Sequence, residues 1–138
     1  MRKDDCIFCK LANGDIPTNT IYEDENFRVI MDAAPATKGH ALVLPKEHFD
    51  NIYDIDADVL ANAVQVGQKV IKHATKVLGC QGYNLLQNNG VAAGQTVFHF
   101  HLHLIPRYEE NDTALLNWTP CEITSDEIKE ITDAIRLD

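Results

Sequence analysis

Apolar and polar residues alternate strictly along one segment in the last third of the chain. From position 98 to position 105 the chain reads FHFHLHLI, with a histidine at every second position. Side chains of a β-strand point to alternate faces, so His99, His101 and His103 are predicted to line one face. The apolar residues from Phe98 to Leu104 are predicted to anchor the other face in the core. A row of three histidines on a rigid strand indicates a chemical site, because histidine titrates near neutrality and binds metals.

A helical period of three to four residues marks a long segment in the middle of the chain. Small and apolar residues recur at this spacing from Asp56 to Leu78, and Gly79 follows where it can end the helix. Within it, Gly67 could permit the close approach of a neighbouring backbone. A second helix is predicted from Thr124, where a capping box precedes isoleucines 128, 131 and 135 on one face.

Shorter apolar runs predict strands at 27–32, 40–44 and 83–87, and a short helix or turn at 6–13. The loops between these runs are too short for repeated crossover connections. The pattern therefore predicts one α+β domain over residues 1–138, with a mostly antiparallel sheet of about five strands, a long helix and a C-terminal helix.

Charge and composition narrow the function classes. The net charge is −9, which argues against a general nucleic-acid-binding protein but leaves room for a small phosphorylated substrate. No apolar run approaches the roughly 20 residues that cross a bilayer, and no secretory leader is recognisable. We therefore expect no membrane or nucleic-acid partner and a cytoplasmic location.

Strand geometry divides the histidine row. Positions two apart on a strand lie about 6.6 Å apart and positions four apart about 13 Å, so His99 and His103 can hardly share one metal ion. Cys6 and Cys9 form a C-x-x-C pair that could bind zinc with His48 and His99. The alternative is two unpaired thiols near a surface histidine.

The other two histidines are predicted beside a glycine-bearing loop, residues 88–95, whose backbone N–H groups could hold a phosphate. A neutral imidazole at His101 could then attack phosphorus, and His103 and Thr96 could stabilise charge or move the leaving group's proton. A metal-dependent reaction and a purely structural row remain alternatives at this point.

The segment from Gln95 to Arg107 resembles the signature of the histidine-triad (HIT) family, His-φ-His-φ-His-φ-φ, where φ is apolar. The resemblance covers about residues 5–108. It includes further segments in the family's order: Cys6-Ile7-Phe8-Cys9, Tyr22-Glu23-Asp24, Asp32, Lys38-Gly39-His40, Pro45-Lys46-Glu47-His48, Asn88-Asn89-Gly90 and Gly94-Gln95. Residues 109–138 match least well.

The resemblance implies a nucleotide hydrolase or nucleotidyl transferase that forms a homodimer by joining two sheets. His101 is the expected nucleophile on the α-phosphorus of a nucleoside monophosphate that carries a leaving group. His103 would contact the phosphate, and His40 would support the site. Thr96 lies where some members place a leaving-group proton donor. Asn88 would contact the phosphate or the leaving group, and Gln95 is a weaker nucleotide-binding candidate.

The resemblance also implies a purine-nucleotide site and a structural zinc ion. Asp32 is expected to accept the ribose hydroxyls. The apolar slot around the base would be formed by Ile7, Phe8, Leu11, Ile30 and Ala33. The zinc ligands would be Cys6, Cys9, His48 and His99.

The leaving group stays open, because the chain resembles both the Hint-like and the Fhit-like branches. Adenosine phosphoramidates, aminoacyl adenylates and dinucleoside polyphosphates are all compatible. A nucleotide-binding adaptor with incidental turnover, and a metalloenzyme that uses the triad as ligands, are the competing hypotheses. Residues 109–138, with Trp118, receive no role.

Overall fold

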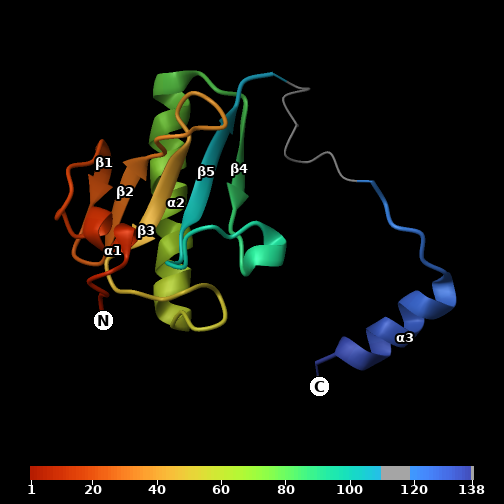
Figure 1. Ribbon diagram of the computed structural model, residues 1–138. Helices are drawn as coiled ribbons and strands as arrows, with labels where there is room; N and C mark the ends of the chain where they lie inside the picture. The colour runs from red at the N-terminus through yellow and green to blue at the C-terminus, as the bar shows by residue number, and fades with distance from the viewer. Residues whose placement is uncertain (110–118, 138) are drawn as a thin grey trace.

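Apolar side chains are buried on both faces of a single sheet in the computed structural model of the protein, which describes residues 1–109 and 119–137. A five-stranded antiparallel sheet in the order β1-β2-β3-β5-β4 has α2 across one face and α1 on the other (Figure 1). The elements are α1 (Ile7–Ala12), β1 (Thr20–Glu23), β2 (Phe27–Met31), β3 (Ala41–Pro45), α2 (Ala57–Leu78), β4 (Gly82–Leu86), η1 (Val91–Ala93), β5 (Leu102–Arg107) and α3 (Ser125–Ile135). The predicted α+β fold is confirmed.

The central strand β3 is buried on both faces, which explains its unbroken apolar sequence. Ala41 and Val43 join the core cluster between the sheet and α2. Leu42 and Leu44 join the smaller cluster under α1, where Phe8 and Leu11 also pack. Because side chains of a strand alternate between its faces, β3 contributes residues to both apolar clusters.

The long helix follows its prediction closely. Asp56 is the N-cap of α2, and Gly79 ends the helix in the left-handed conformation with φ of 69°. A Cβ atom on Gly67 would lie 3.3 Å from Leu104 Cδ2 and 3.4 Å from Leu102 Cδ2. The close neighbour of Gly67 is therefore a pair of side chains of β5 and not a backbone.

The histidine segment is less regular than the prediction. The ladder between β3 and β5 ends at the Val43–Leu102 pair, so His99 and His101 precede the strand. There the chain pairs with the segment after β3 instead, and the Phe100 N–H donates to the Phe49 carbonyl at 2.6 Å. Alternation persists for Phe100, Leu102 and Leu104, which are buried against α2. The prediction for Phe98 is wrong: the chain bends at this residue, and its side chain is 43% exposed.

The C-terminal helix begins as predicted. Thr124 and Glu127 form a reciprocal capping box, but no residue of α3 is buried. In Figure 1 the helix stands apart from the domain, beyond β4. Trp118 lies outside the described residues. Among the described residues, no helix combines the length and apolarity needed to span a membrane.

Candidate functional site

A cavity of about 480 Å³ lies where α1, β2 and the start of β5 meet. Its volume is in the range of small-molecule sites. Eight of the predicted site residues line it: Phe8, Leu11, Ile30, Asp32, Ala33, Thr96, His101 and His103. The sequence reasoning missed Pro17, Thr18, Asn19, Met31, Ala34 and Leu42, which also line it. Of these, Met31 and Ala34 could have been predicted to line the cavity, because they lie within two positions of Asp32 in the sequence.

His101 has one ring nitrogen fixed by the backbone. Its Nδ1 lies 2.7 Å from the His99 carbonyl oxygen, which can only accept, so Nδ1 carries the proton. Nε2 therefore keeps its lone pair. The ring packs edge-on against Phe8 at a centroid distance of 4.9 Å. Burial lowers the pKa of His101 below its ordinary value, which favours the neutral, nucleophilic form.

A chain of hydrogen bonds sets the tautomers of the next two histidines. The Ala36 N–H donates to His40 Nδ1 at 2.9 Å, so the His40 proton is on Nε2. That nitrogen lies 2.9 Å from His103 Nδ1 and donates to it. The proton of His103 is then on Nε2. Burial lowers the pKa of His40, and it lowers that of His103 to about 4.

Asp32 serves both a turn and the cavity. Its Oδ1 accepts a hydrogen bond from the Ala34 N–H at 2.8 Å, while Oδ2 lies 3.4 Å from His40 Nε2. Asp32, His40 and His103 are close enough to hold a metal ion. The shared proton between the two imidazoles already accounts for their approach, so no ion is needed to explain this group.

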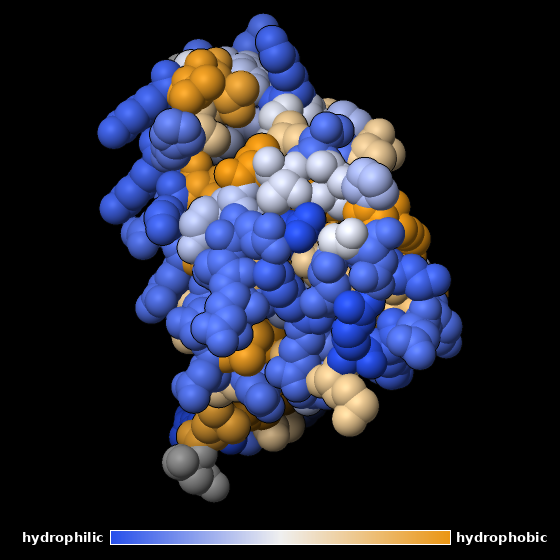
Figure 2. All heavy atoms as spheres, turned by 90° about the vertical axis from the view of Figure 1, so that its left-hand side faces the viewer, coloured by the Kyte–Doolittle hydropathy of each residue, from blue (hydrophilic) through white to orange (hydrophobic). Residues whose placement is uncertain are grey.

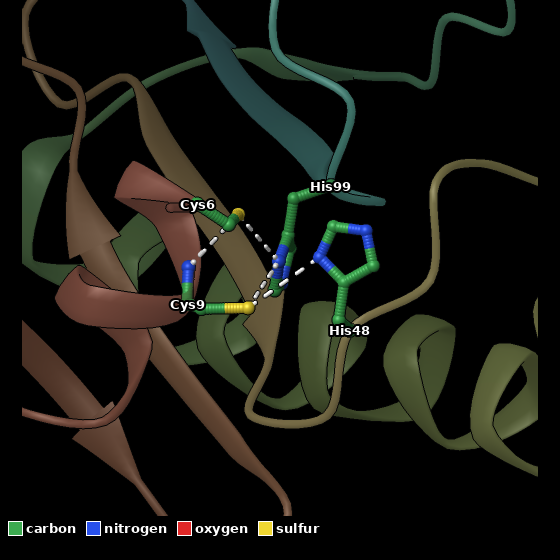
Figure 3. A group of neighbouring side chains, drawn as sticks. All are labelled: Cys6, Cys9, His48 and His99. Carbon is green, nitrogen blue, oxygen red and sulfur yellow. Dashed lines mark hydrogen bonds between the residues drawn. The ribbon is translucent and has the colours of Figure 1, made fainter. Parts of the chain in front are cut away.

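Four side chains from three parts of the chain form a second cluster (Figure 3). Their ligand atoms all lie within 4.8 Å of one another: Cys6, Cys9, His48 and His99. His99 Nδ1 lies 3.4 Å from both sulfur atoms, and His48 Nδ1 lies 3.4 Å from Cys9 Sγ. A tetrahedral zinc site places sulfur and nitrogen ligands about 3.6 Å apart. The donor set and its spacing therefore fit zinc.

The surroundings of this cluster also suit a metal. His99 Nε2 donates to the Pro45 carbonyl and His48 Nε2 donates to Asp50, each at 2.8 Å. Both Nδ1 lone pairs are thereby left to face the thiols, as in zinc sites where the second nitrogen of a histidine is hydrogen-bonded. Burial lowers the pKa of His99 to about 4 and raises that of Cys9.

Four of the predicted catalytic and nucleotide-binding residues are not part of the cavity wall: His40, which lies behind His103 as described above, and Ile7, Asn88 and Gln95. Ile7 is 47% exposed and lines a neighbouring hollow, which Thr96 shares with the cavity. Asn88 is half-buried in the loop before η1. A role for either in nucleotide binding stays a prediction.

Gln95 is buried and fully engaged. Its Oε1 accepts from Asn51 Nδ2 and the Gly90 N–H, and its Nε2 donates to the carbonyls of Asp50 and Val97. This leaves no donor or acceptor for a nucleotide. The side chain holds the loop that carries Thr96, a role that the polar, loop-like sequence around it gave no means to predict.

Comparisons with known proteins agree with these features. The HIT domain family model matches residues 13–110. The adenosine 5'-monophosphoramidase of Schizosaccharomyces pombe is 39% identical over 130 residues, 94% of this chain and 95% of that protein.

Two solved structures add to this. A crystal structure of a HIT family protein from Bacillus anthracis has a TM-score of 0.86 at 41% identity, and the match covers 97% of this chain and 96% of that one. A zinc-bound histidine triad protein from Mycobacterium smegmatis has a TM-score of 0.76 at 42% identity, covering 85% and 84%. Together with the alternating histidines His99, His101 and His103, these matches show that the chain belongs to the histidine-triad (HIT) family.

Proposed function

We propose that the protein hydrolyses a nucleoside monophosphate derivative at its α-phosphorus, through a covalent intermediate on His101. The observation that carries this proposal is the set of tautomers around the cavity. His101 offers a lone pair on Nε2, whereas His103 carries its proton on Nε2. A nucleophile and a hydrogen-bond donor thus sit side by side, with ring centroids 5.0 Å apart.

In the first step, His101 Nε2 forms a bond to phosphorus while the bond from phosphorus to the leaving group breaks. The His101 ring becomes positively charged, and the His99 carbonyl that accepts its Nδ1 proton stabilises this charge. His103 Nε2 donates to a phosphate oxygen. The Thr96 hydroxyl, at the rim between the cavity and the neighbouring hollow, protonates the leaving group and regains a proton from solvent.

In the second step, water attacks phosphorus and the phosphorus–nitrogen bond breaks. The products are the nucleoside monophosphate, a proton and neutral His101. Splitting one difficult substitution into two easier ones is the advantage of the covalent route.

The substrate that we favour is an adenosine phosphoramidate, because the S. pombe relative bears the name of such an enzyme and aligns over nearly its whole length. Phe8, Leu11 and Ile30 offer the base an apolar wall in the cavity. Asp32 Oδ2 is proposed to accept the ribose hydroxyls, because Oδ1 already accepts a hydrogen bond in the turn. Asn88 is proposed to contact the phosphate or the leaving group.

Zinc is proposed as a structural ion on Cys6, Cys9, His48 and His99. When bound, it would supply a cross-link between the N-terminus, the loop after β3 and the histidine segment. The name of the M. smegmatis neighbour, which is zinc-bound, supports this. None of the four ligands needs to touch the substrate.

We further infer a homodimer that joins two sheets at β4. This strand is an edge of the sheet, and Leu85 on it is 45% exposed. An unpaired, regular edge is a ready surface for a second strand. The expected cytoplasmic location stays a prediction.

The test measures hydrolysis of adenosine 5'-phosphoramidate and of diadenosine triphosphate by the wild type and by His101→Gly. Loss of a nucleophile is expected to lower kcat by about 10⁴-fold or more. The variant should regain turnover on adenosine 5'-phosphorimidazolide, because that substrate already carries the missing imidazole. Zinc content and thermal stability serve as the control and should stay unchanged.

Two results would contradict the proposal. Equal rates in wild type and variant would exclude His101 as the nucleophile. Nucleotide binding without turnover in the wild type would favour an adaptor module.

A further inference from the structure

Helix α3 presents an apolar face that the rest of the described chain leaves exposed. Ile128, Ile131 and Ile135 are 50%, 48% and 71% exposed. The helix has 11 residues and none of them is buried. An isolated helix of this length is marginally stable in water, even with a capping box. The apolar stripe therefore indicates that α3 packs on a surface outside its own domain.

A groove of suitable chemistry lies at the other edge of the sheet. It has a volume of about 460 Å³ and runs between β1 and the C-terminal half of α2. Ile21, Val70 and Val77 are among its apolar walls, and Ile21 and Val77 are 48% and 69% exposed. Figure 2 looks onto the β1 side of the molecule and shows apolar patches set into a mostly polar surface.

The charges of the helix and the groove are complementary. Lys69 and His73 line the groove, and Lys72 and Lys76 lie on the same half of α2. Helix α3 has more acids than bases: Asp126, Glu127, Glu130 and Asp133 against Lys129. An amphipathic helix with an apolar stripe and an acidic flank is the kind of ligand that such a groove accepts.

We propose that α3 of one chain docks in the α2–β1 groove of a second copy, so that two chains exchange their C-terminal helices. In one chain, α3 stands beyond the β4 edge of the sheet, level with the N-terminal end of α2 (Figure 1), whereas the groove lies at the β1 edge, along the C-terminal half of α2. A twofold axis beside β4 and perpendicular to the sheet turns the partner by 180° in the plane of the sheet. The partner's groove then lies beyond the β4 edge of the first chain, at the end of the domain where α3 stands. The exchange rests on the homodimer proposed above but not on the hydrolytic chemistry.

The test uses three full-length variants and sedimentation velocity. Ile131→Asn damages the apolar face of α3, and Val77→Asn damages the groove. Lys129→Asn places the same side chain on the polar face of α3 and serves as the control. We expect the first two to raise the dimer dissociation constant by about tenfold or more, which is the effect of losing about 1.4 kcal/mol of contact energy. Lys129→Asn should leave the constant unchanged.

Mixing the two damaged variants is the decisive measurement. Each alone has no intact contact between helix and groove, whereas a mixed dimer has one, the undamaged α3 of the Val77→Asn chain in the undamaged groove of the Ile131→Asn chain. Mixing should therefore restore part of the association.

Three outcomes would overturn the proposal. The first is an unchanged dimer dissociation constant in Ile131→Asn, and the second is a monomeric wild type. The third is no restored association on mixing, which would indicate docking within one chain. Ile128→Asn replaces Ile131→Asn if circular dichroism shows that the latter is unfolded. Hydrolysis is measured in parallel, and its loss alone would bear on the proposed function and not on the exchange.

Discussion

The Cys6/Cys9/His48/His99 cluster and the cavity histidines His101 and His103 use the same side chain in opposite ways. In the cluster, the Nε2 protons of His48 and His99 are donated to oxygen atoms of the protein, and the Nδ1 lone pairs converge on two thiols. In the cavity, Nδ1 of His101 and of His103 is engaged, and Nε2 is left for a ligand. The proposed role of each histidine thus follows from which of its ring nitrogens is not used in a hydrogen bond that orients the ring.

This comparison teaches that burial acts alike in both regions while hydrogen bonding separates them. Burial lowers the pKa of His99 and of His103 to about 4. The rings of His99 and His103 are therefore neutral at neutral pH, which suits a proposed metal ligand in one region and a proposed hydrogen-bond donor to phosphate in the other. Three experiments probe the difference.

Removing the metal cluster should give the largest effect, and the effect should be on stability. Cys9→Ser is expected to lower the free energy of unfolding by several kcal/mol, because structural zinc binding is folding free energy. Cys80→Ser is the matched control, since Cys80 is also buried but belongs to neither group of potential metal ligands among the described residues. Urea titration with and without added zinc measures both. A Cys9→Ser protein that keeps its free energy of unfolding but has a lowered kcat would show that the cluster acts in catalysis instead.

Replacing His40 should lower turnover and leave the metal in place. His40→Leu removes the donor to His103 Nδ1, so His103 can take the wrong tautomer. We expect kcat to fall by about 10- to 100-fold, as for other residues that orient a functional histidine. His40→Gln, whose amide can still donate, should lose less. An effect on KM alone, or equal losses in the two variants, would show that His40 does not set the tautomer.

The smallest effect is a pH dependence of stability. The unfolded pKa of histidine is about 6.5, whereas burial holds that of His103 at about 4. Between these values the unfolded chain binds a proton that the folded chain does not. Stability is therefore full above about pH 6.5 and falls as the pH drops toward 4. Thermal unfolding from pH 7 to pH 4.5 should show a shallower fall for His103→Gln than for the wild type. Parallel curves would contradict the lowered pKa.

The elements that local chemistry specifies could be predicted from the sequence. The period of α2, its end at Gly79 and the capping box of α3 need only nearby residues, and the structure has all three. The two-sided burial of β3 follows in the same way from its apolar run. The Cys6/Cys9/His48/His99 group was found because C-x-x-C spacing limits the geometry.

The rest depended on contacts between distant segments. Phe98 fits the alternating pattern, but the bend that admits His99 to the metal cluster exposes its side chain. Gln95 reads as a loop residue, yet its four partners come from two separate loops. Thr18 and Asn19 line the cavity without any pattern that could mark them. Periodicity in the sequence predicts on which face of an element a side chain lies, but it does not predict which distant residues that side chain contacts.

For three of the histidines, the atoms that fix the tautomer are main-chain atoms. The carbonyls of Pro45 and His99 and the N–H of Ala36 fix the protons of three histidines. Any amino acid supplies a carbonyl, and every residue but proline supplies an N–H. A mutational scan of side chains would thus pass over the groups that assign the tautomers of His40, His99 and His101. Replacing single backbone amides by esters is the kind of chemistry that would make them visible.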